Sequence, residues 1–166
     1  MRELFLGGAR SGKSRLAEQR AANFKQDVFY IATAQAYDNE MKQRISRHQT
    51  DRSSEWRTIE EPLHLADVLQ QHAQEGRVIL VDCLTLWLSN LLCKDDELFF
   101  QSQKEQFTQC YETLPGHIIL VSNEVGQGVI PDNALARRFV DEAGWLHQSL
   151  AAQSDQVTWV TAGLAQ

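Results

Sequence analysis

The residues best suited to chemistry stand near the start of the chain, in the pattern G-x-x-x-x-G-K-S. They are Gly7, Gly8, Ala9, Arg10, Ser11, Gly12, Lys13 and Ser14. Glycines in this pattern allow a tight turn whose backbone N–H groups point inward, where the positive end of the following helix helps to hold a polyphosphate. The pattern, called the P-loop, places Lys13 on the β- and γ-phosphates and the Ser14 hydroxyl on Mg²⁺.

A second candidate is the acidic residue that ends the aliphatic run Val-Ile-Leu-Val-Asp at residues 78–82. A buried parallel strand that delivers one carboxylate to its C-terminal end is the Walker B arrangement. A carboxylate in such a place is costly to bury unless it is paired or close to a metal. We therefore predict that Asp82 binds Mg²⁺ or its water, the alternative being that it only caps the helix expected from Leu84.

His48 is the most interesting of the five histidines, because arginines surround it. It ends a helix predicted to run from Asp38, on the face that also carries apolar residues. Taken alone, a histidine there is more simply a half-buried packing residue. Arg44, Arg47 and Arg52 could neutralise a polyphosphate, and a neutral imidazole can attack phosphorus and form a covalent intermediate. Spacing alone equally allows the arginines to be a solvated helix face.

Glu124 follows a predicted strand and precedes two glycines. Its carboxylate could orient a nucleophile, hold a metal-bound water or merely cap a turn. The histidines other than His48 fit packing or surface roles. Among them, His147 is expected to lie off the apolar stripe of its helix.

Strands and helices alternate along the chain. Strands are predicted at residues 4–6, 28–32, 56–60, 78–82, 118–121 and 157–160, and helices at 15–24, 38–48, 63–73, 84–93, 98–114 and 134–152. This alternation predicts an α/β fold of the P-loop NTPase type (RecA-like), with a mostly parallel sheet and helices on both faces. Ligands bind such sheets at the C-terminal ends of the strands, where the P-loop, Asp82 and Glu124 would meet.

Composition narrows the class of protein. The length of 166 residues predicts one nucleotide-binding domain over residues 1–166. The net charge of −6 argues against nucleic acid as the main partner. Three scattered cysteines and no signal-peptide pattern predict a cytoplasmic protein without disulfides or a zinc site. The longest apolar stretch, residues 78–92, is too short and too polar to span a membrane.

Taken together, these motifs resemble the bifunctional adenosylcobinamide kinase / adenosylcobinamide-phosphate guanylyltransferase family of cobalamin assembly. The resemblance covers nearly the whole chain. The P-loop is shared with many families, whereas Arg44-Ile45 followed by His48 is far more specific when combined with Asn123-Glu124-Val125-Gly126. Further matching positions are Tyr30-Ile31-Ala32-Thr33, Asp38, Glu40, Met41, Arg52, Trp56, Thr58, Glu60, Leu84, Thr85, Asn90, Leu91, Leu92, Gly128, Pro131, Asn133, Leu135, Ala136 and Arg137.

The resemblance implies two reactions and a site for each. One moves a phosphoryl group from ATP or GTP to a hydroxyl of adenosylcobinamide, and the other moves GMP from GTP to adenosylcobinamide phosphate through GMP bound to a histidine, by motif match His48. Lys13 and Mg²⁺ would stabilise the departing pyrophosphate. The resemblance also implies a homotrimer. Besides the P-loop, the nucleotide would be held by Ala32, Thr33, Ala34, Gln49, Thr50, Asp51, Arg52, Glu60 and Asp82.

Two alternatives stay open from the residues themselves. One is a P-loop kinase or nucleotidyltransferase for another small molecule, and the other is a non-catalytic GTP- or ATP-binding switch module. The tail at residues 161–166 looks short against the usual end of the family, so the partner of the last strand is left undecided. No motif marks the residues that would contact the corrinoid.

Overall fold

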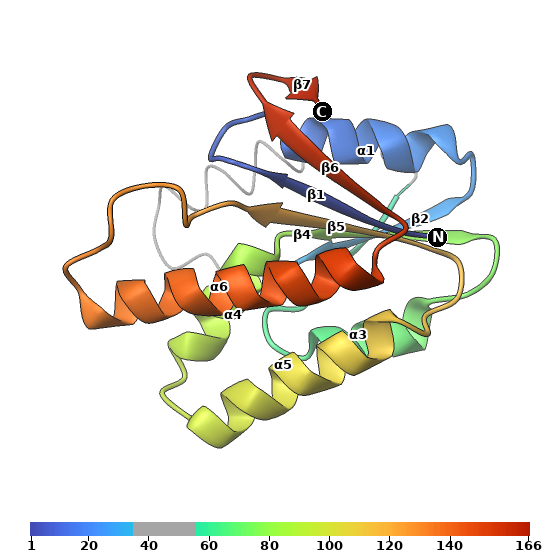
Figure 1. Ribbon diagram of the computed structural model, residues 1–166. Coiled ribbons are helices and arrows are strands. Elements are labelled where there is room, and N and C mark those ends of the chain that lie inside the picture. The colour runs from blue at the N-terminus through green and yellow to red at the C-terminus, as the bar shows by residue number, and fades with distance from the viewer. Residues whose placement is uncertain (35–55) are drawn as a thin grey trace.

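The computed structural model describes residues 1–34 and 56–166 (Figure 1). The predicted helix at 38–48, and with it His48, lies outside these residues. The elements are β1 (Arg2–Gly7), α1 (Lys13–Asn23), β2 (Asp27–Ala32), β3 (Arg57–Glu60), α3 (Leu65–His72), β4 (Arg77–Asp82), α4 (Leu84–Leu92), α5 (Glu97–Tyr111), β5 (His117–Asn123), α6 (Ala134–Gln153), β6 (Gln156–Thr161) and β7 (Leu164–Ala165).

The strands form one seven-stranded sheet in the order β3-β2-β4-β5-β1-β6-β7. Every neighbouring pair is parallel except β6 and β7, which are antiparallel. The carboxyl ends of the parallel strands therefore share one edge, and the connection from β5 to α6 extends beyond that edge (Figure 1). This architecture confirms the predicted α/β fold of P-loop NTPase type.

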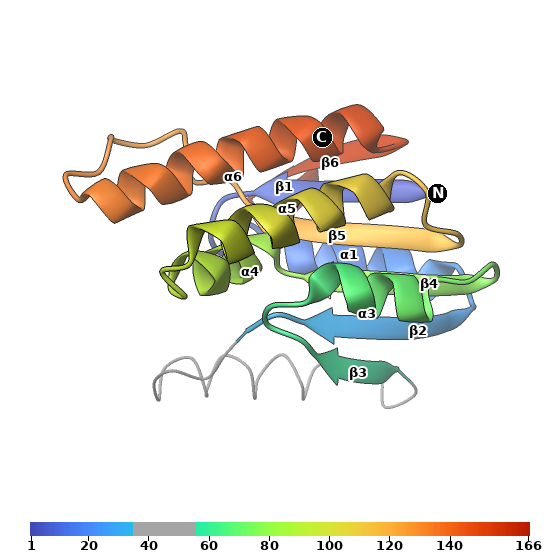
Figure 2. The same cartoon turned by 90° about the horizontal axis from the view of Figure 1, so that it is seen from below.

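Helices cover both faces of the sheet, as predicted, but unequally within the described residues. Helix α1 packs on one face, and α3, α4, α5 and α6 pack on the other (Figures 1 and 2). Along β4 the side chains alternate between the two layers. Val78 and Leu80 join the apolar cluster beneath α1, whereas Ile79 and Val81 join the larger cluster beneath the four helices. Burial on both faces is why the central strands read as continuous aliphatic runs.

The last strand has a partner from its own tail. Strand β7 pairs with β6 through Thr161 opposite Leu164, and Gln166 exchanges backbone hydrogen bonds with Trp159 at 2.8 and 3.2 Å. The turn between the two strands contains Gly163, with a φ of 80°. The short tail therefore forms a hairpin with β6, so β7 is the partner strand that the sequence left undecided.

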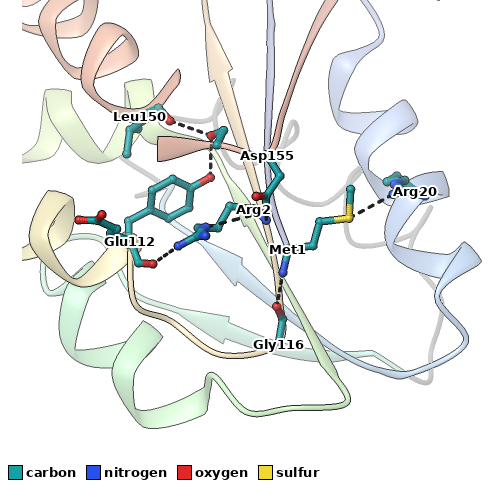
Figure 3. Close-up of polar contacts among 9 residues, drawn as sticks. Met1, Arg2, Arg20, Glu112, Gly116, Leu150 and Asp155 are labelled. Carbon is teal, nitrogen blue, oxygen red and sulfur yellow. Dashed lines mark hydrogen bonds and ion pairs between the residues drawn. The ribbon is translucent and has the colours of Figure 1, made fainter. Parts of the chain in front are cut away.

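Polar contacts fasten the edge of the sheet opposite the P-loop (Figure 3). The Met1 nitrogen donates to the Gly116 carbonyl at 2.8 Å, and the Arg2 N–H donates to Asp155 Oδ2 at 2.6 Å. The Arg2 guanidinium also donates to the Glu112 carbonyl. Since β1 leads directly into the P-loop, these contacts fix its amino end while its carboxyl end serves the site.

Candidate nucleotide-binding site

The P-loop connects β1 to α1, and its two outer glycines have steric reasons to be glycine. A Cβ on Gly7 would lie 2.3 Å from the Val160 carbonyl oxygen and 2.7 Å from Ser11 Oγ. Gly12 has a φ of 94°, a left-handed conformation that residues with a side chain rarely adopt. The Ser11 N–H donates to the Gly8 carbonyl at 3.2 Å and closes the turn. The loop thus folds in the way its sequence pattern predicts.

Hydrogen-bond donors at this loop are left for a ligand. The N-cap of α1 is Gly12, which has no side chain to accept from the first turn of the helix. Within residues 1–34 and 56–166, the first N–H groups of α1 therefore have no side-chain cap. Ser11 Oγ is also buried without a hydrogen-bond partner in the described part of the chain. A phosphate at a helix N-terminus satisfies donors of this kind, so the loop fits an anionic ligand.

Lys13 folds back over the loop. Its side chain is only 6% exposed, and Nζ donates to the Gly8 carbonyl at 3.1 Å. Burial lowers the pKa of the Lys13 ammonium, and the neighbouring Cys83 and Asp82 act in the opposite direction. A desolvated cation held here by a backbone carbonyl can turn to phosphate oxygens and balance their charge.

Asp82 lies at the carboxyl end of β4, half-buried. The Tyr30 hydroxyl donates to Asp82 Oδ2 at 3.0 Å and orients the carboxylate. Among the described residues there is no group of three or more His, Cys, Asp or Glu side chains that could hold a metal ion. The carboxylate of Asp82 and the hydroxyl of Ser14 are nevertheless the oxygen donors that Mg²⁺ accepts, because this ion takes its remaining ligands from water and substrate phosphates.

The end of β2 meets the end of β4 through Thr33. Its hydroxyl donates to the Cys83 carbonyl at 2.7 Å and accepts from the Cys83 N–H at 2.9 Å. The buried amide of Asn90 donates to the carbonyls of Thr33 and Pro62, at 2.8 and 3.1 Å. Asn90 therefore joins the point where the chain leaves β2 to the point where it leaves β3.

The sheet brings the predicted nucleotide residues of β2, β3 and β4 to one edge but spreads them along it. Ala32 pairs with Asp82 on one side and with Glu60 on the other, and Thr33 and Ala34 follow. Four strand spacings of about 4.8 Å separate β3 from β1, about 19 Å in all. A nucleotide held by the P-loop must extend along the edge to reach Glu60. The predicted residues His48, Gln49, Thr50, Asp51 and Arg52 lie outside the described residues.

The prediction for His147 was wrong, and the structure places it in a buried polar cluster. His147 is 7% exposed, and its Nε2 lies 2.7 Å from Ser122 Oγ, where β5 ends. Its Nδ1 lies 3.8 Å from Glu124 Oε2, and the Glu124 N–H donates to the Gly7 carbonyl at 3.0 Å. Burial lowers the pKa of His147, while Glu124 raises it. The cluster thus connects α6 to the first residue of the P-loop.

The signal for His147 was present in the sequence. It lies four residues after Ala143 and three before Leu150, so it shares the buried face of α6 with both. Glu124 itself is partly buried, and its Oε1 also accepts from the Gly126 N–H. The Glu124 carboxylate therefore caps a turn, which is one of the three roles predicted for it. Glu124 also lies beside the P-loop, through its hydrogen bond to Gly7.

A glycine loop of this geometry, at the edge where β4 presents a carboxylate, defines a P-loop nucleotide-binding protein of the α/β class. Comparison with known proteins takes the assignment further. Residues 3–166 match the family described as cobinamide kinase / cobinamide phosphate guanyltransferase. The chain therefore belongs to this enzyme family, and the resemblance drawn from its motifs is confirmed.

Relatives match along almost their whole length. The chain is 57% identical over 164 residues to the bifunctional adenosylcobalamin biosynthesis protein CobP of Pseudomonas aeruginosa, covering 99% of this chain and 95% of the relative. It is 39% identical over 174 residues to the bifunctional adenosylcobalamin biosynthesis protein CobU of Escherichia coli, covering 97% and 96%. The corresponding protein of Salmonella typhimurium is 38% identical with the same coverage. No helix within residues 1–34 and 56–166 is long and apolar enough to cross a membrane.

Proposed function

We propose that this protein phosphorylates adenosylcobinamide with ATP or GTP and then transfers GMP from GTP to the resulting adenosylcobinamide phosphate. The products of the second step are adenosyl-GDP-cobinamide and pyrophosphate. The observation that carries the proposal is the family match over residues 3–166. The P-loop supports it, because its free donors suit the triphosphate that both reactions consume.

In the kinase step the substrate hydroxyl attacks the γ-phosphorus and the nucleoside diphosphate leaves. Lys13 bridges the β- and γ-phosphates, and the first N–H groups of α1 hold the oxygens whose charge grows in the transition state. Mg²⁺, held by Ser14 and Asp82, would neutralise charge on the same phosphates when bound. The Tyr30 hydroxyl, which donates to Oδ2 of Asp82, would keep this carboxylate oriented for the ion.

In the transfer step a neutral imidazole nitrogen of His48 attacks the α-phosphorus of GTP. A nitrogen–phosphorus bond forms, the bond to the bridging oxygen breaks, and pyrophosphate leaves with its charge balanced by Lys13. The phosphate of adenosylcobinamide phosphate then attacks the same phosphorus and restores the imidazole. Arg44, Arg47 and Arg52 would hold phosphate oxygens during this attack.

Labelling with α-labelled GTP and Mg²⁺ tests this assignment. We expect the protein to acquire an acid-labile, base-stable label that adenosylcobinamide phosphate discharges. His48→Ala should not be labelled, whereas the matched control His64→Ala, at the exposed start of α3, should be labelled as the wild type is. Persistent label in His48→Ala would remove this histidine from the role.

The remaining nucleotide contacts are proposed from the family motifs: Ala32, Thr33, Ala34, Gln49, Thr50, Asp51, Arg52, Glu60 and Asp82. Glu60 is the most informative of them, because it is exposed on β3 and far from the P-loop strand. Glu60→Gln should weaken GTP binding in a direct titration. Unchanged affinity would take Glu60 out of the site.

We also propose a cytoplasmic homotrimer in which residues 1–166 act as one nucleotide-binding domain. Three free cysteines support a reducing compartment. Val129, Ile130 and Leu135 are exposed apolar side chains beside the site edge and could meet another subunit. Light scattering should give the mass of three chains, and a monomeric mass at micromolar concentration would contradict the trimer.

A further inference from the structure

The turn between β6 and β7 lies against the P-loop. The Gly163 N–H donates to the Ser11 carbonyl at 2.7 Å, a hydrogen bond between residues 152 positions apart. On its other side Ser11 is held by its own N–H, which donates to Gly8 at 3.2 Å. The backbone of Ser11 is therefore fixed on both sides, inside the loop that must receive phosphate.

Two glycines permit this close approach. A Cβ on Gly12 would lie 3.1 Å from the Gly163 Cα, so the two backbones pack with no side chain between them. Gly163 has a φ of 80°, and a Cβ there would lie 3.2 Å from Arg15 Nη2. The contact thus involves the last residue of the loop, the first turn of α1 and the tip of the hairpin.

The hairpin is itself anchored to the strand that enters the loop. Strand β6 pairs with β1 through Gly7 opposite Val160, and β7 pairs with β6. A flexible loop must be ordered before its N–H groups can converge on a phosphate, and that ordering reduces the observed affinity. Here the loop is held between the end of β1 and the tip of the hairpin before any ligand arrives.

We propose that Gly163 is a positioning residue for nucleotide binding, because its N–H fixes the Ser11 carbonyl and thereby holds the P-loop in its phosphate-binding conformation. The inference rests on the proposed function in one respect, namely that the P-loop binds nucleotide. Gly163 lies outside every motif described in the sequence, so the inference adds a new residue to the nucleotide site. Both reactions should depend on it equally, because both use the same loop.

The test compares three variants. Deletion of residues 162–166 removes the hydrogen bond and leaves β6 in the sheet. Gly163→Ala keeps the chain length but strains the turn. Gly76→Ala is the matched control, because Gly76 has a φ of 77° with nothing within 4 Å of the added Cβ, and it precedes β4 at the opposite edge of the sheet. Each variant is titrated with a fluorescent GTP analogue and Mg²⁺, and its thermal unfolding is followed by circular dichroism.

We expect the deletion to raise Kd about fivefold, which corresponds to about 1 kcal/mol for one hydrogen bond. Gly163→Ala should raise Kd in the same direction, and Gly76→Ala should leave it unchanged at a similar loss of Tm. KM for ATP and GTP should rise by the same factor at constant kcat, since loss of folded protein would lower kcat instead.

Wild-type affinity in the folded deletion variant would overturn the inference, as would an equal rise in Kd for Gly76→Ala and Gly163→Ala. If the deletion does not fold, the comparison of the two alanine variants decides. A wild-type protein that binds no nucleotide would overturn the proposed function together with this inference, whereas wild-type binding in the variants overturns the inference alone.

Discussion

Tyr30 gives the sharpest test of the predicted metal site. Its ring is 1% exposed in the core beneath α1, and its hydroxyl donates to Asp82 Oδ2 at 3.0 Å. Tyr30→Phe removes that donor and keeps the ring. We predict that the variant needs about ten times more Mg²⁺ for half-maximal kinase activity, because the Asp82 carboxylate is no longer held in one orientation.

The magnitude follows from the contact. A hydrogen bond to a charged acceptor contributes about 1.5–3 kcal/mol. Asp82 is half-buried, so its carboxylate recovers part of the loss from water and the lower end of the range applies. A change of about 1.5 kcal/mol corresponds to about tenfold in affinity. Saturating Mg²⁺ should restore kcat, because no catalytic group has been removed.

The assay is the initial rate of ATP-dependent phosphorylation, with Mg²⁺ varied at a fixed nucleotide concentration. Tyr111→Phe is the matched control. Tyr111 is also fully buried, but its hydroxyl bonds to Ser154 Oγ at 2.9 Å, next to the start of β6. Equal Mg²⁺ requirements in Tyr30→Phe and the wild type would refute the reasoning, and so would an equal shift in Tyr111→Phe.

Three further predictions concern stability. Arg20→Met should lower the free energy of unfolding, measured in urea, by about 3 kcal/mol, because the carboxylate of Glu3 is 2% exposed and is paired with Arg20 at 2.8 Å. Adding Glu3→Gln to this variant removes the unpaired charge and should recover part of the loss. Asn90→Leu should cost about 2–3 kcal/mol, since two backbone carbonyls, one of them that of Thr33, lose their donor; an unchanged denaturation midpoint would contradict this. Burial lowers the pKa of His147 from its ordinary 6.5, so the unfolded chain binds more protons than the folded one as the pH falls below 6.5. The free energy of unfolding should therefore decline from pH 7 to pH 5, less steeply in the Gln variant of this histidine, and parallel pH profiles would show that it is not responsible.

Much of the fold could be predicted, because strong periodic signals coincide with long elements. The aliphatic run at residues 78–82 predicted a buried strand, and the glycine loop at 7–14 predicted a turn from a strand to a helix. Both patterns also predicted that the end of this strand and the loop lie at the carboxyl edge of the sheet. The hairpin was not predictable in the same way, since β7 has two residues and its pairing depends on a turn at Gly163 rather than on any apolar pattern.

The site was only partly predictable for a related reason. Lys13, Ser14 and Asp82 belong to motifs whose chemistry fixes their spacing, whereas the hydrogen bond from Gly163 to Ser11 spans nearly the whole chain and leaves no local trace. The apolar pattern of α6 does not reveal that His147 is buried, because that pattern contains only residues such as Ala143, Leu146 and Leu150. A helix face includes polar residues when a partner such as Ser122 lies opposite.

The position of β1 in the sheet has a consequence for synthesis of the protein. Its two neighbours are β5 and β6, and Arg2 pairs with Ile118, which the ribosome adds 116 residues later. At 5–20 residues per second, Leu4, Phe5 and Leu6 wait about 6–23 s for the first partner strand. The nucleotide site at the front of the chain is therefore among the last parts to be completed, and the apolar side chains of β1 stay without their partner strands until then.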